Sequence, residues 1–184
     1  MELNKAILNR WSPRGFSNLQ ATEEMIGLLF EAARKAPSSY NLQPWSYFYA
    51  TRKNDKGFNA LLSFLTGNNP GWAKEAQLLI VSAIRKTKPE INDANNRAYY
   101  DLGAANVSMA IQAAHMGLQV HQMGGFNSEK AAAYLKIDTT VWEPVVMIAV
   151  GFPPEIEDFR EDQHQRLAQH NTRKNIEDFV FELK

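Results

Sequence analysis

Two groups of basic and polar side chains near the ends of the chain are its best candidates for binding an anion. Arg10, Ser12 and Arg14 make up the first group, and Asn171 and Arg173 belong to the second. Arginine suits a phosphate because its planar guanidinium carries a fixed charge and can donate to two oxygens at once. Each group alone is more often a set of solvated surface charges. Taken singly, neither group is a strong signal for a site.

A polar loop, APSSYNLQPWS (36–46), is the next candidate. It lies between a helical pattern and a strand pattern, where a much shorter link would suffice. Pro37, Ser38, Ser39 and Asn41 supply turn chemistry, but a plain connector does not need so many hydrogen-bonding side chains or a tryptophan. The loop alone is equally compatible with a structured turn and with part of a binding site.

Several other kinds of site are excluded or disfavoured. The chain has no cysteine, which rules out disulfides, thiolate catalysis and cysteine metal ligands. It contains neither a G-x-G-x-x-G fingerprint nor a P-loop, and its four histidines form no H-E-x-x-H motif. His115 lies within an apolar helical segment and is expected to be a satisfied interior histidine. We expect no metal site.

Length and composition favour one domain. A chain of 184 residues supports one good core and is short for two, so residues 1–184 are expected to form a single domain. The 20 basic and 20 acidic residues give zero net charge, and no bulk field attracts nucleic acid or an anionic membrane. The N-terminal stretch MELNKAILNRW lacks the apolar run of a signal peptide. We expect a cytoplasmic protein whose partner is a small molecule rather than a nucleic acid or a membrane.

Hydrophobic patterns predict the helices and strands that must position these side chains. Thr22 is a candidate N-cap, and the apolar stripe that follows it at helical spacing is ended by Pro37. Asn69, in GNNPGW, is expected to be a turn residue. Further helices are predicted over residues 58–65 and 128–137, and strands over residues 46–51, 77–84, 118–123 and 144–152. Helices separating strands, without hairpin-length links, predict a mixed α/β or α+β layer fold.

Two segments depart from that pattern. Residues 101–116 are apolar or small almost all round, which predicts a central helix covered on several sides. Residues 153–178 are polar and charged, with too few apolar side chains for a core of their own, yet FVFEL (179–183) alternates like a strand. Such a strand must join a sheet edge in its own subunit or in a partner, and the length of the polar segment favours a partner.

Together and in this order, the motifs resemble the nitroreductase-like family of flavoproteins. The family's R-[RHS]-S-x-[RK]-x-F block is matched over residues 10–16, and its A-P-S-S-x-N-x-Q-P-W loop over residues 36–45. Further matches are an asparagine before a buried strand (Asn69), a D-x-G-A-A helix (101–105), a G-G-F turn (124–126) and a P-x-x-x-I-A-x-G-x-P strand (144–153). The resemblance covers essentially the whole chain, and the Pro-Ser-Ser loop is its most specific part.

The resemblance implies a central, mostly antiparallel sheet flanked by helices, in a homodimer. Residues 153–184 would form a C-terminal extension that wraps the partner subunit and exchanges its last strand. One flavin mononucleotide (FMN) would occupy each of two sites at the subunit interface. Carried over by position, the cofactor-binding residues would be Arg10, Trp11, Ser12, Arg14, Pro37, Ser38, Ser39, Asn41, Asn69, Gly124, Gly125, Asn171 and Arg173.

The family pattern also implies a role for most of these residues. Arg10 and Arg173 would bind the phosphate, and Ser12 would meet the ribityl chain or the phosphate. Arg14 would approach the pyrimidine edge of the ring, and Asn69 would bond the same edge.

Backbone groups and a second subunit would complete the implied site. Gly124 and Gly125 would present backbone N–H groups near N5, and residues 37–39 would come from the other subunit. Trp11 stands where the family usually has a basic or polar residue, and Trp72 stands at a position that is often a lysine.

The implied function is that of an NAD(P)H-dependent FMN oxidoreductase. Hydride from NADH or NADPH would pass by a ping-pong route to an electron-poor acceptor such as a nitroaromatic compound or a quinone. The flavin supplies the chemistry, so we assign no catalytic residue. Tyr40 and Tyr99 are candidates for walls of the substrate pocket, although aromatic residues are more often ordinary packing. Enone reduction, dehalogenation or dehydrogenation, and a flavin-binding dimer without turnover, are the alternatives.

Overall fold

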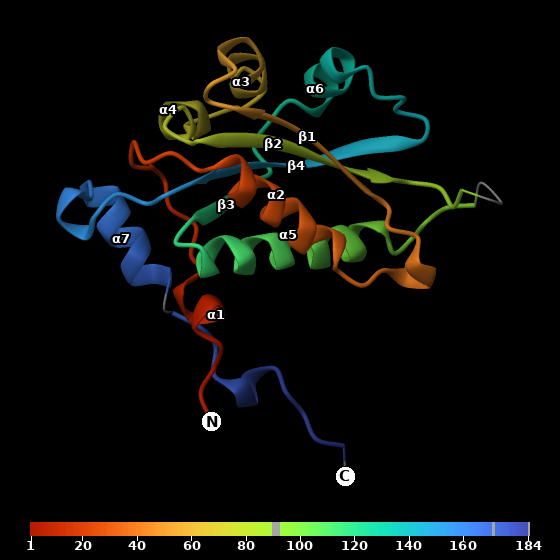
Figure 1. Ribbon diagram of the computed structural model, residues 1–184. Helices are drawn as coiled ribbons and strands as arrows, with labels where there is room; N and C mark the ends of the chain where they lie inside the picture. Colours follow the sequence, from red (N-terminus) through yellow and green to blue (C-terminus); the bar gives the residue numbers. More distant parts are fainter. Residues whose placement is uncertain (90–92, 171, 184) are drawn as a thin grey trace.

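A four-stranded antiparallel sheet forms the centre of the protein in the computed structural model, which describes residues 1–89, 93–170 and 172–183. The strand order is β1-β2-β4-β3, and every neighbouring pair is antiparallel. The strands are β1 (Trp45–Thr51), β2 (Leu78–Arg85), β3 (Gln119–Met123) and β4 (Trp142–Gly151). Helices cover both faces of the sheet (Figure 1). The expected mixed α+β fold with a mostly antiparallel sheet is confirmed.

Strand β2 is buried on both sides. Its successive side chains point to opposite faces of the sheet, and helices cover both faces. Leu79 and Val81 pack into one core with α3 (Asp55–Leu62), α4 (Asn69–Ala73) and α6 (Ser128–Leu135). On the other face, the alternate side chains of β2 pack with α2 (Glu23–Arg34) and α5 (Ala98–His115). This two-sided burial explains the continuous apolar run in the sequence.

Side-chain caps decide where two of the helices begin. The Thr22 hydroxyl accepts a hydrogen bond from the Met25 N–H at 3.1 Å, which confirms the expected start of α2. Asn54 caps α3 by accepting from the Gly57 N–H at 3.1 Å. Helix α3 therefore begins before the predicted span of 58–65, and that prediction was wrong by one turn.

Two predictions about local environment are also corrected. Asn69 is the first residue of α4 rather than part of a simple turn, because Pro70 supplies a backbone angle suited to the first helical turn. Helix α5 is covered on several sides by the sheet and by α2, as predicted, and Tyr100 and Val107 lie on its exposed stripe. His115 lies at the exposed end of that helix and is not an interior residue.

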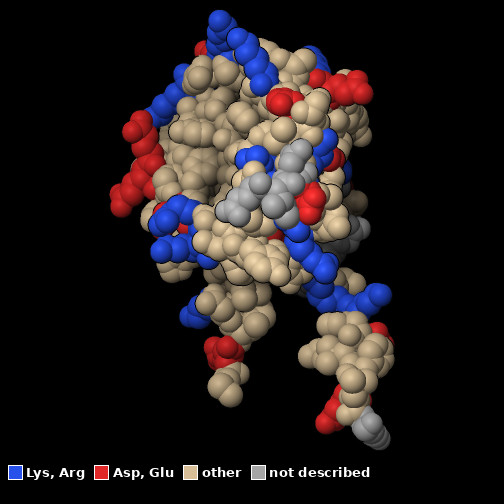
Figure 2. Space-filling view, turned by 90° about the vertical axis from the view of Figure 1, so that its right-hand side faces the viewer, with Lys and Arg blue, Asp and Glu red and all other residues tan. Residues whose placement is uncertain are grey.

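Both ends of the chain carry helices that the hydrophobic pattern did not predict, α1 (Lys5–Asn9) and α7 (Glu161–His170). Beyond them the chain ends leave the body as two separate projections (Figures 1 and 2). Residues 179–183 form no strand in the single chain, and the Phe181 side chain is 75% exposed. The exchange of this segment with a partner thus stays a prediction. Among the described residues, no helix is long and apolar enough to cross a membrane.

Candidate functional site

Two arginines from opposite ends of the chain approach each other. Arg10 follows α1 directly and is partly buried. Burial of its guanidinium and the nearby positive charge of Arg173 both lower the pKa of Arg10. Like charges held close together favour an anion between them. The structure therefore joins the two basic groups that the sequence leaves separate.

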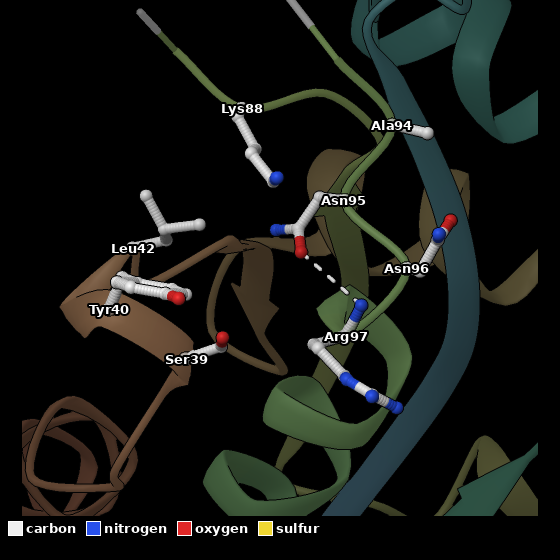
Figure 3. Close-up of a pocket in the computed structure, with 8 residues that line it drawn as sticks. All are labelled: Ser39, Tyr40, Leu42, Lys88, Ala94, Asn95, Asn96 and Arg97. Atoms are coloured by element: carbon white, nitrogen blue, oxygen red, sulfur yellow. Dashed lines mark hydrogen bonds between the residues drawn. The ribbon is translucent and has the colours of Figure 1, made fainter.

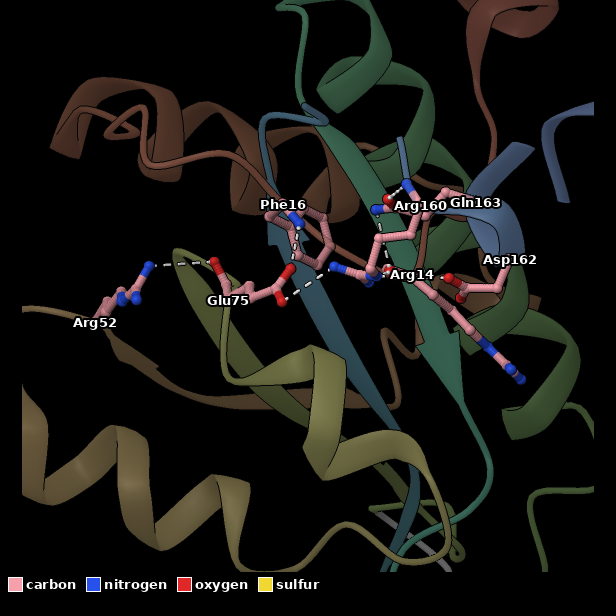
Figure 4. A network of polar contacts seen from close by, with 7 residues as sticks. All are labelled: Arg14, Phe16, Arg52, Glu75, Arg160, Asp162 and Gln163. Atoms are coloured by element: carbon pink, nitrogen blue, oxygen red, sulfur yellow. Dashed lines mark hydrogen bonds and ion pairs between the residues drawn. The ribbon is translucent and has the colours of Figure 1, made fainter. Parts of the chain in front are cut away.

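The segment that carries Arg14 is held by the C-terminal extension (Figure 4). Arg160, directly before α7, donates from Nη2 to the Arg14 carbonyl at 2.5 Å and from Nη1 to Glu75 Oε1 at 3.3 Å. The other carboxylate oxygen of Glu75 accepts from the Phe16 N–H at 3.2 Å. Residues 14–16 are thus fixed from two directions.

Gln163 completes this attachment from within α7. Its side chain is only 1% exposed, and its Oε1 accepts from the Arg160 N–H at 2.7 Å while Nε2 donates to the Arg14 carbonyl at 3.3 Å. Gly15, with φ +145°, leaves the space that the Gln163 amide needs, because a Cβ at residue 15 would collide with it. Trp11 adds an apolar contact to the extension, with its ring 5.6 Å from that of Phe159.

Two buried N–H donors near this segment have no hydrogen-bond partner among the described residues. They are Arg14 Nε and Trp72 Nε1. The Trp72 ring lies 4.6 Å from the His121 ring, and His121 Nδ1 is 2.7 Å from the Pro13 carbonyl oxygen. A buried donor without an acceptor costs about 1–3 kcal/mol. A ligand with acceptor oxygens or nitrogens would recover part of that cost.

The turn after β3 meets the start of α4. Asn69 Nδ2 donates to the Gly125 carbonyl at 3.2 Å. A Cβ at residue 125 would lie 2.8 Å from the same Nδ2 atom, so a larger residue would displace the Asn69 amide from this position. Gly124 is exposed with open space at its Cβ position. The sequence-predicted residues 69, 124 and 125 are therefore brought together.

The loop of residues 37–43 has an unusual backbone. Tyr40, Asn41 and Gln43 all have φ near +50°, a region that residues other than glycine seldom adopt. Two hydrogen bonds hold this conformation. The Ser39 N–H donates to Asp101 Oδ2 at 3.2 Å, and the Gln43 N–H donates to Ser38 Oγ at 3.0 Å. Backbone strain of this kind often marks a functional loop.

The predicted site residues fall into two groups at opposite ends of α5. The loop is fixed to Asp101 in the first turn of α5, whereas the Trp11 N–H donates to Gln119 Oε1, just beyond its last turn, at 2.9 Å. Helix α5 has 18 residues, which corresponds to about 27 Å at about 1.5 Å per residue. Figure 1 shows the loop and α1 at the two ends of this helix. One chain does not bring Ser38 and Ser39 to the arginines.

The remaining predicted residues are placed as follows. Ser12 is exposed beside the arginines, and Asn171 lies outside the described residues. The Tyr40 side chain, 93% exposed, lines a cavity of about 400 Å³ together with Ser39 (Figure 3). The Tyr99 hydroxyl instead donates to Glu143 Oε1 at 2.6 Å, a bond that raises the pKa of Tyr99.

Glu75, Arg160 and Gln163 were missed by the sequence reasoning. Two of them lie in the polar segment 153–178, where a helix of charged residues carries no apolar stripe. The sequence offers only Gln163 and Leu167, four residues apart in a helix with three glutamines, and this spacing is too weak a signal to identify a buried amide.

A sequence model of the Nitroreductase family matches residues 7–66 and 52–152 of this chain. The match spans most of the chain, and the protein belongs to the nitroreductase family.

Solved structures share its fold over nearly the whole length. One, described as an oxidoreductase containing FMN, is 27% identical, with a TM-score of 0.89 and coverage of 100% of this chain and 93% of that chain. A Parabacteroides distasonis protein, whose name combines NADH dehydrogenase and NAD(P)H nitroreductase, is 25% identical with a TM-score of 0.69, covering 86% and 93%. A Desulfovibrio desulfuricans protein crystallised in complex with FMN is 20% identical with a TM-score of 0.73, covering 97% and 95%.

Proposed function

We propose that this protein is an FMN-dependent oxidoreductase that passes hydride from NADH or NADPH to an electron-poor acceptor such as a nitroaromatic compound or a quinone. The observation that carries the proposal is the approach of Arg173 to Arg10 from the opposite end of the chain. Family membership and the 27% identical oxidoreductase containing FMN support it.

The described residues would suit FMN in charge and in hydrogen-bond donors. Arg10 and Arg173 would offer two guanidinium groups to a phosphate dianion, which relieves the repulsion between them. Arg14 Nε and Trp72 Nε1 are buried donors that lack an acceptor among the described residues. The close contact of Asn69 with Gly125 would leave their polar groups beside the flat edge of a ring.

Bound FMN would supply two-electron exchange between donor and acceptor at one position of its ring. Arg10 and Arg173 would hold the phosphate and so orient the ring. The fixed charge of Arg14 would favour the negative charge that develops at the pyrimidine edge on reduction. The bonds from Arg160 and Gln163 to the Arg14 carbonyl would keep that charge in place.

A homodimer would complete each site. Residues 37–39 cannot reach the arginines of their own chain across the length of α5, so the proposal assigns them to the cofactor of the partner subunit. The exposed Tyr100 and Val107 of α5 and the exposed C-terminal residues 179–183 are apolar surfaces that a second subunit would cover.

A spectrum of the purified protein tests the proposal. We expect a yellow protein with a flavin absorbance band, one FMN per chain by chromatography after release, and bleaching by NADH or NADPH without oxygen. Bound flavin adenine dinucleotide, or no flavin after reconstitution with FMN, would refute the cofactor assignment. Bound FMN that neither donor bleaches would leave a binding protein without this activity.

A further inference from the structure

The cavity beside the 37–43 loop is lined by hydrogen-bond donors. Its volume is about 400 Å³, and it lies between that loop on one side and Lys88 and residues 94–97 on the other. Figure 3 shows the Lys88 ammonium, the Asn95 amide nitrogen and the hydroxyl groups of Ser39 and Tyr40 directed toward its middle. None of the described residues that line it is an aspartate or a glutamate. Such a cavity favours a ligand that carries negative charge and accepts hydrogen bonds.

Asn95 is the best-defined of these donors. Asn95 is only 7% exposed. Its Oδ1 accepts a hydrogen bond from the Arg97 N–H at 3.3 Å, and its Nδ2 points into the cavity (Figure 3). Nδ2 forms no hydrogen bond with a described residue, and it is not among the fully buried donors, so it is accessible from the cavity. A positioned and accessible amide N–H is available to an acceptor group of a ligand.

Lys88 supplies the charge. Its ammonium forms no ion pair with a described carboxylate. Lys88 and Asn95 lie on paired segments, because the Lys88 N–H donates to the Asp93 carbonyl at 2.8 Å and the Asn95 N–H to the Lys86 carbonyl at 2.7 Å. The backbone pairing thereby fixes the positions from which the two side chains extend.

The strained 37–43 loop forms the side of the cavity that faces Lys88 and Asn95. Tyr40, at φ 52°, is presented to solvent by a backbone that Asp101 and Ser38 hold in place. Packing does not explain this conformation, because the Tyr40 ring is almost wholly exposed. A ligand bound between Tyr40 and Lys88 would contact this strained loop, and backbone strain is common in ligand-binding loops.

We propose that this cavity binds the carboxylate or phosphate of a substrate, with Lys88 providing the charge and Asn95 the directional hydrogen bond. This inference rests on the proposed function, because residues 37–39 of the same loop are assigned there to the flavin site. The protein would accordingly prefer anionic substrates over neutral ones of the same shape. The anionic group would belong either to the electron acceptor or to the nucleotide donor.

Binding of a matched pair of probes tests the inference without turnover. Calorimetry on the purified protein would compare 4-nitrobenzoate with neutral 4-nitrobenzamide, for wild type, Lys88→Gln, Asn95→Asp and the control Lys56→Gln on exposed helix α3. We expect 4-nitrobenzoate to bind wild type more tightly than the amide, and Lys88→Gln to weaken it about tenfold, the scale of one charged hydrogen bond. Asn95→Asp should weaken it further, because a carboxylate would then face the anion.

Rapid kinetics on the FMN-loaded protein distinguishes the two sources of the anion. If the acceptor supplies it, Lys88→Gln slows reoxidation by 4-nitrobenzoate and leaves reduction by NADH and NADPH unchanged. If the donor supplies it, the reduction step is slowed instead. Equal affinity of wild type for the two nitro compounds, together with unchanged half-reactions in Lys88→Gln, would overturn the inference. A protein without FMN would refute the proposed function, and the calorimetry would still decide whether the cavity binds anions.

Discussion

Arg10 and Arg173 form an arrangement that is unfavourable for the protein by itself. Burial removes part of the hydration of Arg10, and the nearby Arg173 adds repulsion, which together lower the pKa of Arg10. A site selected only for stability would place a carboxylate there. A pair of cations at this position is instead expected to stabilise the protein when an anion is bound.

Arg173→Ala should therefore affect the FMN-bound and FMN-free protein differently. We expect FMN binding to weaken by about 1.5–3 kcal/mol, the scale of a charged hydrogen bond. The thermal midpoint of the FMN-free protein should change much less than that of the FMN-bound protein, because removal of Arg173 relieves repulsion with Arg10. Fluorescence titration with FMN and calorimetric unfolding measure the two effects. An equal loss of stability with and without FMN would show that Arg173 is a structural residue.

Arg14→Gln should change the redox potential more than the binding of FMN. Arg14 would interact with negative charge that develops on reduction, so its loss should lower the midpoint potential by about 30–60 mV, equivalent to about 1.4–2.8 kcal/mol for two electrons. Arg34→Gln is the control, since Arg34 forms an exposed pair with Glu31 at 2.6 Å on α2. An unchanged potential in Arg14→Gln with FMN still bound would place the stabilising charge elsewhere.

At the scale of elements, polar contacts rather than an apolar stripe hold helix α7 on the body of the protein. Its residues are mostly charged, yet it is fixed to the body through the Gln163 amide and through Arg160, both of which bond the Arg14 carbonyl. The helix thus joins the segment that bears Arg173 to the segment that bears Arg14. It couples the phosphate end of the proposed site to its ring end.

Gln163→Leu tests this coupling. Leucine keeps the apolar volume but leaves the Arg160 N–H without its acceptor, so we expect a loss of about 1–3 kcal/mol in stability and weaker FMN binding. Gln165→Leu is the control on the same helix, because Gln165 is exposed and its Nε2 donates to Glu161 Oε1 at 3.0 Å on the helix surface. Thermal unfolding, FMN titration and limited proteolysis after residue 158 measure the effects. Two variants that behave alike would show that the buried amide does not anchor the extension.

The elements were predictable wherever local chemistry agreed with the hydrophobic pattern. Helix α2 has both a capping threonine and an apolar stripe, and the four strands have apolar runs between turn residues. The predicted span of helix α3 began one turn too late because the Asn54 cap precedes the apolar residues of the helix. Helix α7 was missed because long-range polar bonds, which leave no periodic pattern, hold it in place.

The residues of the candidate site could be named from the sequence, and their assembly was implied by the family resemblance rather than by any local pattern. The motif around Arg10 and the loop around Ser38 are visible in the sequence, and the resemblance assigns them to one cofactor. Their separation by the length of α5 depends on tertiary packing, as does the approach of Arg173 to Arg10. No local pattern encodes either relationship.

At the scale of the whole molecule, the apolar C-terminal segment is left uncovered. Phe181→Asp should abolish the dimer, because a buried carboxylate at this position would be costly in a strand pairing with a partner. FMN should be lost as a consequence if residues 37–39 come from the partner. Light scattering and flavin absorbance of Phe181→Asp and of Glu182→Ala, a control in the same segment, measure both. A dimeric, yellow Phe181→Asp protein would show that this segment does not hold the subunits together.

Mixed dimers test directly whether each site is shared between two chains. One subunit would carry Arg173→Ala, and the other would carry Ser39→Trp, whose bulky ring would occupy space beside the flavin. If each site combines Arg173 of one chain with Ser39 of the other, the mixed dimer has one site with both defects and one intact site. It should then bind about half as much FMN as wild type, whereas each parental dimer binds little at the same FMN concentration. If both residues belonged to one chain's site, every site in the mixed dimer would carry one defect, and mixing would restore no binding. Subunits labelled with different affinity tags, purified in tandem and titrated with FMN, distinguish these outcomes, and the separation of the two groups by the length of α5 predicts the first.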